Sequence, residues 1–321
     1  MTVALTFPGQ GSQTVGMGKA LADSFPAAKA VFDRIDAALS QKLSAIIFDG
    51  PEADLTLTAN AQPALMATSM AALAALQAEC GFDVGRDAAF VAGHSLGEYS
   101  ALCAAGALTL EDAAKLLRIR GDAMQKAVPV GQGAMAAILG LDFPAVSAIA
   151  QDAQNALYLS GAICEAANDN GGGQVVISGT KEAVERAMEL AKKAGAKRAI
   201  LLPVSAPFHC SLMQPAADAM AAALKDVTIL KPKIPLVANV TADAVSDPEA
   251  IRQNLVKQVT GAVRWRESVA YMAAHGVDRF FEIGAGKVLS GLVKRLAPEA
   301  SAQNFGAPAD IEAYKAARQT P

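Results

Sequence analysis

The chain has 321 residues and a formal net charge of −3 at pH 7. Its residues are 52% hydrophobic but only 5% aromatic, a composition that favours helices packed through small side chains over a β-sandwich. A nucleic-acid-binding surface must be basic, so this charge balance argues against that class of protein.

Targeting segments, disulfides and metal sites are also disfavoured. The first seven residues lack the basic region and apolar core of a signal peptide, and charges, Gly or Pro interrupt every apolar stretch. The four cysteines are scattered and form no C-x-x-C pair, so neither a disulfide framework nor a zinc site is indicated. We therefore expect a soluble, cytoplasmic protein with no bound metal.

Residues 3–7 predict a buried strand, and the glycine-flanked Gln10 follows it. The glycines here fit neither a P-loop nor a dinucleotide fingerprint, because Met17 and Thr14 stand where lysine and a third glycine belong. At the carboxyl end of a strand in an α/β sheet, Gln10 is either a polar contributor to an oxyanion site or a simple turn residue. Helices are predicted at residues 25–39 and 62–76, the second after a polar loop at 56–60.

The pattern Gly93-His94-Ser95-Leu96-Gly97 lies between an apolar run and a small-residue helix. This is G-x-S-x-G in a strand-to-helix context, which is typical of a nucleophile elbow. The turn leaves no room for Cβ atoms beside Ser95, which explains the two glycines. The amide of Leu96 then points toward an oxyanion over Ser95. The alternative is an ordinary glycine-bounded turn with a capping serine.

Residues 110–128 predict an amphipathic helix. Arg120 falls on its apolar face, three residues after Leu117 and four before Met124. Burying a guanidinium without a partner is costly. Arg120 therefore either reaches solvent or an internal ion pair, or binds a substrate carboxylate through its planar fork.

The pattern changes at about residue 131, where alternating strands and helices follow in the order βαββαβ. This is the order of a ferredoxin-like unit, with a turn expected at residues 168–173. We predict an insertion at residues 131–204 into a main domain made of residues 1–130 and 205–321. The predicted strands are 134–139, 162–167, 174–178 and 199–204, and the helices are 144–156 and 181–194.

The chain then returns to the main domain, where helices and strands alternate again. The polar tail after Pro298 is expected to be peripheral. The predicted helices are 213–224, 248–259, 268–275 and a last one ending at 296, and the strands are 235–240 and 279–283.

A nucleophilic serine needs a base, and the sequence offers three histidines. His94 adjoins Ser95 in an extended segment and should point to the opposite side. His275 lies at a predicted helix end, where capping explains it. His209, on a Pro-bounded loop, is the remaining candidate. No acid between Ser95 and His209 stands out as the third member of a triad.

Together these motifs resemble the malonyl-CoA:acyl carrier protein transacylases of bacterial fatty-acid synthesis. Any one motif is weak, whereas the ordered set spans nearly the whole chain. The set is Phe7-Pro8-Gly9-Gln10-Gly11-Ser12-Gln13, Gln62-Pro63-Ala64-Leu65, Gly93-His94-Ser95-Leu96-Gly97-Glu98, Arg120-Gly121-Asp122-Ala123-Met124, Gly173-Gln174-Val175-Val176-Ile177-Ser178-Gly179, Phe208-His209-Cys210 and Glu282-Ile283-Gly284-Ala285-Gly286-Lys287-Val288-Leu289.

The resemblance implies an α/β fold with a hydrolase-like parallel-sheet domain and an inserted ferredoxin-like βαββαβ subdomain. It implies that Ser95 is the nucleophile and His209 the base, and that Gln258 supplies a carbonyl in place of an acid to orient the histidine. Arg120 would bind the malonyl carboxylate. Gln10 and the Leu96 amide would form the oxyanion site.

Phe208, before the histidine, resembles the malonyl-selecting version of this segment. The implied partners are malonyl-CoA and the phosphopantetheine thiol of a holo-acyl carrier protein, with no cofactor, nucleic acid or membrane, and we expect a monomer. Basic residues could face an acidic carrier, although ordinary solvated charge explains most of them. They are Lys192, Lys193, Lys197, Arg198, Lys287, Lys294 and Arg295.

Three other functions fit the same elbow. A serine thioesterase or esterase would have no need for a buried cation such as Arg120. A non-catalytic carrier-docking module would not need the complete set of Ser95, His209, Gln10 and Arg120. A trans-acting acyltransferase of polyketide synthesis would use the same chemistry with another carrier.

Overall fold

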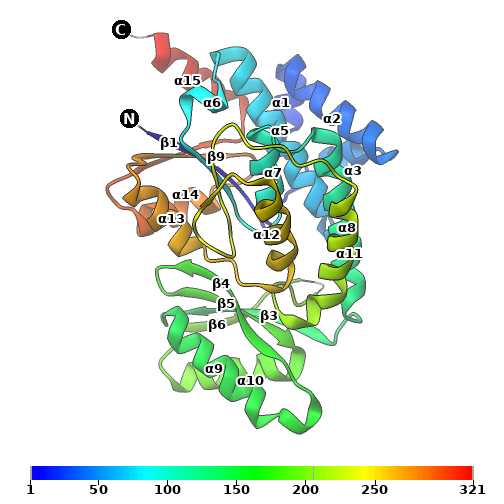
Figure 1. Ribbon diagram of the computed structural model, residues 1–321, viewed down its shortest axis with the longest axis vertical. Helices are drawn as coiled ribbons and strands as arrows, with labels where there is room; N and C mark the ends of the chain where they lie inside the picture. Colours follow the sequence, from blue (N-terminus) through cyan, green and yellow to red (C-terminus); the bar gives the residue numbers. More distant parts are fainter. Residues whose placement is uncertain (1, 205, 320–321) are drawn as a thin grey trace.

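The computed structural model describes residues 2–204 and 206–319, which form two sheets with helices packed against each (Figure 1). The larger sheet has the strand order β10-β9-β1-β2-β7-β8. Its first five strands in this order run parallel, and β8 is antiparallel to β7. The strands are β1 (Val3–Phe7), β2 (Phe90–Gly93), β7 (Leu236–Val237), β8 (Ala244–Val245), β9 (Arg279–Ile283) and β10 (Ser301–Phe305).

Strand β1 lies between β2 and β9, and each of its five residues is buried. Successive side chains of a strand point to opposite faces, so a strand covered on both faces is mostly apolar. The one polar residue of β1, Thr6, donates its hydroxyl to the Phe281 oxygen at 3.3 Å. Leu5 and Phe7 belong to the main core, whereas Ala4 belongs to a second core on the opposite face. Parallel strands end at a common edge, which places Phe7 of β1 beside Gly93 of β2.

Fifteen α-helices and two short 3₁₀ helices are present in the described residues. Figure 1 shows α5 and α8 on one side of the larger sheet and α13 and α14 on the other. The helices are α1 (Lys19–Ser24), α2 (Pro26–Leu39), α3 (Leu43–Asp49), α4 (Glu52–Thr56), α5 (Thr58–Cys80), α6 (Val84–Asp87), α7 (Gly97–Ala104), α8 (Leu110–Ala127), α9 (Phe143–Ala156), α10 (Lys181–Lys193), α11 (Gln214–Lys225), α12 (Pro248–Thr260), α13 (Trp265–Ala274), α14 (Val288–Leu296), α15 (Pro308–Gln319), η1 (Tyr158–Ser160) and η2 (Ser211–Met213).

The smaller sheet is antiparallel, with the order β4-β5-β3-β6. Helices α9 and α10 cover one of its faces (Figure 1) and share with it a hydrophobic core separate from those of the larger sheet. The chain order βαββαβ is the one predicted for the ferredoxin-like unit. The strands are β3 (Gly133–Leu139), β4 (Cys164–Gly171), β5 (Gln174–Thr180) and β6 (Arg198–Leu201).

The predicted fold class, a parallel-sheet domain with a ferredoxin-like unit, is confirmed. The four strands of the smaller sheet all lie within residues 131–204. The domain boundaries stay a prediction, and Ser205, at the second boundary, lies outside the described residues, as do Met1, Thr320 and Pro321.

Three local predictions are wrong. The tail after Pro298 is not peripheral: β10 pairs with β9 at the edge of the larger sheet, and Phe305 and Ile311 are fully buried. The polar loop predicted at 56–60 is largely helical, because α5 begins at Thr58. The turn predicted at 168–173 is mostly strand, since β4 continues to Gly171 through two register shifts that accommodate its polar sequence.

None of the helices within 2–204 and 206–319 is long and apolar enough to span a membrane. Several short helices, among them α1, α3, α4 and α6, were not predicted, because four to seven residues are too few for a periodic pattern.

The crossing of α8 over α5 yields a first prediction. A Cβ on Gly121 of α8 would lie 2.6 Å from Ala59 Cα and 2.7 Å from the Thr58 oxygen, both backbone atoms of α5. We expect Gly121→Ala to lower the stability by about 1–3 kcal/mol through overpacking, although alanine is the better helix former.

Gly291 of α14 is the matched control, because no atom lies within 4 Å of the Cβ that Ala would add. Gly291→Ala should leave stability unchanged or raise it by about 0.5–1 kcal/mol. Urea unfolding followed by circular dichroism measures both variants. A Gly121→Ala variant as stable as the parent would contradict the close helix crossing.

Candidate active site

Ser95 lies in a sharp turn between β2 and α7, and its backbone has a left-handed φ of 53°. A Cβ on Gly93 would lie 1.9 Å from the carbonyl carbon of Gly97, and a Cβ on Gly97 would lie 2.3 Å from the Phe7 oxygen. Both contacts are far inside van der Waals distance, so each position requires glycine. A strained non-glycine residue in such a turn is typical of a functional site.

The Ser95 hydroxyl lies 2.7 Å from His209 Nε2. His209 Nδ1 lies 2.9 Å from the backbone oxygen of Gln258 and 3.2 Å from that of Gly261. Carbonyl oxygens only accept hydrogen bonds, so Nδ1 carries the proton. Nε2 is then free to accept a hydrogen bond from the Ser95 hydroxyl. This arrangement has the geometry of a nucleophile–base pair in which two neutral carbonyls orient the base.

His209 is almost completely buried. Burial, together with the positive charge of Arg120, lowers the pKa of His209 to about 3. The imidazole is therefore neutral at physiological pH, which is the state that a general base requires.

Arg120 comes from α8 and is 1% exposed. One terminal nitrogen donates to Gln62 Oε1 at 2.8 Å, and the other donates to Gln258 Oε1 at 2.8 Å and to Ser95 Oγ at 3.2 Å. Its guanidinium carbon lies 5.9 Å from the centre of the Tyr99 ring. Within the described residues Arg120 makes no ion pair, so its charge is held by neutral acceptors next to Ser95.

A buried polar network holds the elbow from behind. The side-chain amide of Gln258 donates to the Ser95 carbonyl at 2.9 Å and to Glu98 Oε2 at 2.9 Å. The Asn239 side chain accepts from the Ser95 amide at 2.8 Å and donates to the Gly93 carbonyl at 2.6 Å, while its backbone amide donates to Glu98 at 3.1 Å. Gln258 thus contacts the serine, the arginine and, through its carbonyl, the histidine.

A cavity of about 530 Å³ opens in front of these groups. Ser95, His209 and Arg120 line it together with Gln10 and Phe208. The larger sheet's carboxyl edge, β3 to β5 and α14 also contribute, so the cavity lies between the two sheets. The other lining residues include Gln62, Met135, Asn168, Asn170, Gln174, Leu202, Val204, Val288, Leu289 and Leu292.

The two expected oxyanion groups are placed differently. Gln10 lines the cavity and accepts a hydrogen bond from the Thr58 hydroxyl through Oε1 at 2.9 Å, which orients its amide. Leu96 is buried beneath the turn, at the N-terminal end of α7, and its side chain does not line the cavity. Their roles in an oxyanion site stay predictions.

The other two histidines have structural partners. His94 Nε2 lies 2.9 Å from Asn170 Oδ1, and its ring packs at 5.7 Å from that of Trp265. His275 follows α13 as its cap, with Nδ1 2.8 Å from the Tyr271 oxygen. His209 is therefore the histidine paired with Ser95. In the part of the chain that the structure describes, no group of three or more His, Cys, Asp or Glu side chains could hold a metal ion.

Sequence reasoning missed three of the residues that support the site. Glu98 and Gln62 lie within motifs quoted above. Glu98 could have been noticed, because a charged residue in the first turn of the small apolar helix α7 indicates a buried polar contact. Asn239 follows the short strand β7 at the sheet edge, where polar residues converge, but nothing in its local sequence marks it.

Glu98 yields a second prediction. Burial raises the pKa of this fully buried carboxyl to about 7, against 4.5 for an ordinary Glu. The folded state thus binds the proton more tightly than the unfolded chain does, so this contribution to stability is full below about pH 4.5 and is lost as the pH rises through 7. Glu98→Gln cannot ionise and escapes that loss.

We therefore expect the difference in Tm, variant minus parent, to increase by about 2–4 °C between pH 5 and pH 8. The opposite pH dependence contributed by His209 is common to both proteins and cancels. Differential scanning fluorimetry across this range measures the difference, with Glu312→Gln on the exposed face of α15 as control. An equal Tm difference at every pH would contradict a raised pKa for Glu98.

Comparisons with known proteins show the family to which the chain belongs. The profile of the acyl transferase domain family matches residues 5–305. The malonyl CoA-acyl carrier protein transacylase of Bacillus subtilis is 49% identical over 294 residues, which cover 92% of this chain and 90% of that protein.

Among solved structures, the acyl-carrier-protein-S-malonyltransferase of Bartonella henselae superimposes with a TM-score of 0.94 at 56% identity, covering 99% of each chain. A malonyl-transacylase solved in complex with its type II PKS acyl-carrier protein gives a TM-score of 0.93 at 42% identity, covering 99% of this chain and 100% of that one. This chain therefore belongs to the acyl transferase domain family and, within it, to the malonyl CoA-acyl carrier protein transacylases.

Proposed function

We propose that this protein transfers the malonyl group of malonyl-CoA to the phosphopantetheine thiol of an acyl carrier protein, through a malonyl ester on Ser95. The observation that carries this proposal is the state of Arg120, a buried guanidinium that donates to the Ser95 hydroxyl and has only neutral acceptors. A malonyl group attached to Ser95 brings a carboxylate to this cation. An acyl group without a carboxylate would leave the charge buried and unpaired.

In the first half-reaction Ser95 Oγ attacks the thioester carbonyl while its proton moves to His209 Nε2, 2.7 Å away. The negative charge that develops on the carbonyl oxygen is stabilised by the Gln10 side chain and the Leu96 amide. When the tetrahedral intermediate collapses, the carbon–sulfur bond breaks and the CoA thiolate takes the proton from His209. The product is a malonyl ester on Ser95.

The second half-reaction is the reverse with a different thiol. His209 removes the proton of the carrier's phosphopantetheine thiol, whose sulfur attacks the ester carbonyl. Collapse of this intermediate releases the Ser95 oxygen, which recovers its proton from His209. This is a ping-pong mechanism in which each thiol occupies the same cleft in turn, and no cofactor takes part in it.

Selectivity is assigned to Arg120 and to the shape of the acyl pocket. Bidentate pairing of the guanidinium with the malonyl carboxylate excludes acetyl groups by charge. Phe208 is buried at the cavity wall beside His209, and we assign it the exclusion of a substituent at the malonyl α-carbon.

We further propose that the chain acts as a monomer of two domains, with residues 131–204 inserted between residues 1–130 and 205–321. The separate hydrophobic core of the smaller sheet supports this division. The cavity between the sheets is then an interdomain cleft. Lys287, Lys294 and Arg295, on and beside α14 at this cleft, are candidates to meet an acidic carrier.

A carrier from polyketide synthesis is a second candidate substrate. The structural relative at 42% identity was solved with a type II PKS acyl-carrier protein. The chemistry at Ser95 is the same for both carriers, so the two differ only in the surface that docks.

The covalent intermediate is the first test of this function. After brief incubation with malonyl-CoA, intact mass spectrometry should show one malonyl adduct on the protein and none on Ser95→Ala, because the ester forms on that hydroxyl. Adding holo-acyl carrier protein should discharge the adduct onto the carrier. Steady release of CoA in the absence of a carrier, with no adduct, would instead identify a thioesterase.

The second test addresses Arg120. In Arg120→Ala the malonyl carboxylate enters a buried site without its cation, and we expect malonyl loading to fall about 100-fold, the cost of removing one partner of a buried charge pair. Loading from acetyl-CoA should be retained or rise, because the variant no longer buries an unpaired charge beside the acyl group, and this also shows that the elbow remains folded. An equal loss for both substrates would contradict a carboxylate-binding role.

A further inference from the structure

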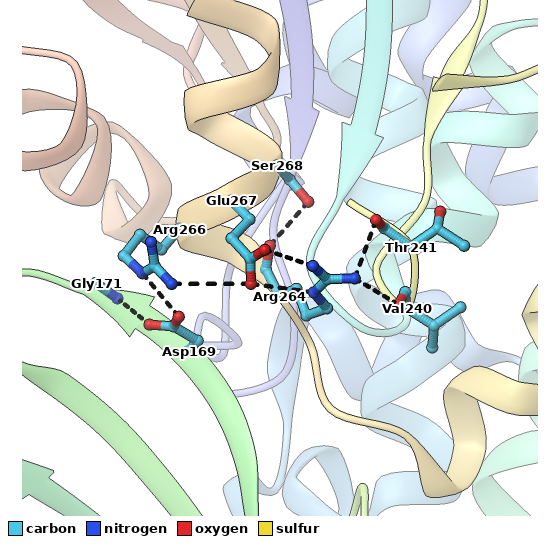
Figure 2. A network of polar contacts seen from close by, with 8 residues as sticks. All are labelled: Asp169, Gly171, Val240, Thr241, Arg264, Arg266, Glu267 and Ser268. Atoms are coloured by element: carbon cyan, nitrogen blue, oxygen red, sulfur yellow. Dashed lines mark hydrogen bonds and ion pairs between the residues drawn. The ribbon is translucent and has the colours of Figure 1, made fainter. Parts of the chain in front are cut away.

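One wall of the cleft is the end of β4, where the side chains of three consecutive residues point alternately to opposite sides of the strand. Asn168 and Asn170 line the cavity. Asp169, between them, faces away and is buried, and its Oδ2 accepts from Arg266 Nε of α13 at 2.8 Å (Figure 2). Its Oδ1 accepts from the Gly171 amide at 3.2 Å. The carboxylate therefore joins the smaller sheet to a helix of the larger unit.

This end of β4 depends on outside support. Its pairing with β5 is interrupted between Ala166 and Asn168 and again between Asp169 and Gly171. Beside these shifts, Asn168 also forms an isolated parallel bridge with Val263, in the segment that leads into α13. The Val263 oxygen accepts from the Asp169 amide at 2.9 Å, and the Val263 amide donates to the Ala167 oxygen at 2.9 Å.

The same segment, residues 261–264, also reaches the catalytic groups. Gly261 supplies the second carbonyl at His209 Nδ1, 3.2 Å away. The Arg264 amide donates to the backbone oxygen of Asn239, whose side chain holds the Ser95 amide. The Arg264 side chain pairs with Glu267 and donates to the oxygens of residues 240 and 241 (Figure 2), so the segment is fixed on the larger unit.

A third connection returns from the wall to the elbow. Asn170 lies 2.9 Å from His94, the residue directly before Ser95. The ring of Trp265, between Arg264 and Arg266, packs against the same histidine. The Asp169–Arg266 pair thus lies at the junction of three parts of the site: the end of β4, the segment that carries the Gly261 carbonyl, and the turn that carries Ser95.

We propose that Asp169, paired with Arg266, is a positioning residue that fixes the end of β4 against residues 261–264, so that Asn168 and Asn170 face the cleft at the right distance from Ser95. The assignment rests on the proposed function, because the substrate it positions is malonyl-CoA. It predicts an effect on substrate binding rather than on the chemical step, since His209 keeps the closer Gln258 carbonyl when the pair is lost.

The test uses Asp169→Asn, Arg266→Gln, the double variant and Arg266→Lys. Asp169→Asn keeps an oxygen for the Gly171 amide and loses only the charge. Arg186→Gln is the control, because it breaks an exposed i,i+3 pair with Glu189 on α10, away from the cleft. Rapid-quench mass spectrometry measures the rate of Ser95 malonylation against malonyl-CoA concentration.

We expect the half-saturating malonyl-CoA concentration to rise about five-fold in Asp169→Asn and Arg266→Gln, with a maximal rate within about two-fold of the parent. The half-saturating concentration of the double variant should not exceed the higher of the two single-variant values, because the two partners act as a unit. Arg266→Lys and Arg186→Gln should behave like the parent. Unchanged half-saturation in all variants alongside a lower Tm would overturn the proposal, and so would a loss confined to the maximal rate.

A second readout does not depend on malonyl transfer. Trp265 is the sole tryptophan of the chain and is fully buried at this junction. Acrylamide quenching of its fluorescence should increase about two-fold in Asp169→Asn and Arg266→Gln, and not in Arg266→Lys or Arg186→Gln. Failure of the parent to form an adduct contradicts the proposed function, whereas unchanged quenching contradicts the positioning role.

Discussion

The active site is organised around one buried charge. A guanidinium that is 1% exposed has lost its hydration, and the protein compensates with oriented amide oxygens of Gln62 and Gln258 and with the face of Tyr99. These acceptors hold Arg120 in place without neutralising it. The site is therefore preorganised for an anion, and the position of Ser95 Oγ at 3.2 Å decides where that anion is attached.

Gln258 links this charge to the hydrogen-bonded pair of Ser95 and His209. Its side chain accepts from Arg120 and donates to Glu98, while its backbone oxygen accepts from His209. A side-chain carboxylate at His209 would raise the basicity of the imidazole, but it would also attract Arg120 away from the substrate. Neutral carbonyls avoid that competition. A weaker base suffices, because a thiolate is a good leaving group and a thioester demands less activation than an amide.

The local sequence was sufficient to predict those site residues that are set by backbone geometry or by the periodicity of one helix. Gly93 and Gly97 identify the elbow because no other residue fits beside Ser95. The 3.6-residue period places Arg120 on the buried face of α8, and with only three histidines the candidate base could be chosen by elimination. The ferredoxin-like order of residues 131–204 was likewise readable, because its helices and strands are long and strongly patterned.

Sequence by itself thus determined the fold class and singled out Ser95, the candidate base His209 and the buried Arg120, through local patterns or, for the histidine, through elimination. Only the tertiary structure decided what surrounds them. Glu98 and Asn239 are 141 residues apart, Ser95 and Gln258 are 163 apart, and Asp169 and Arg266 are 97 apart. A polar residue carries no local mark of a distant partner, because its hydrogen bonds are set by how the sheets and helices pack. For the same reason the polar tail was assigned to the surface, although pairing with β9 makes β10 part of the larger sheet.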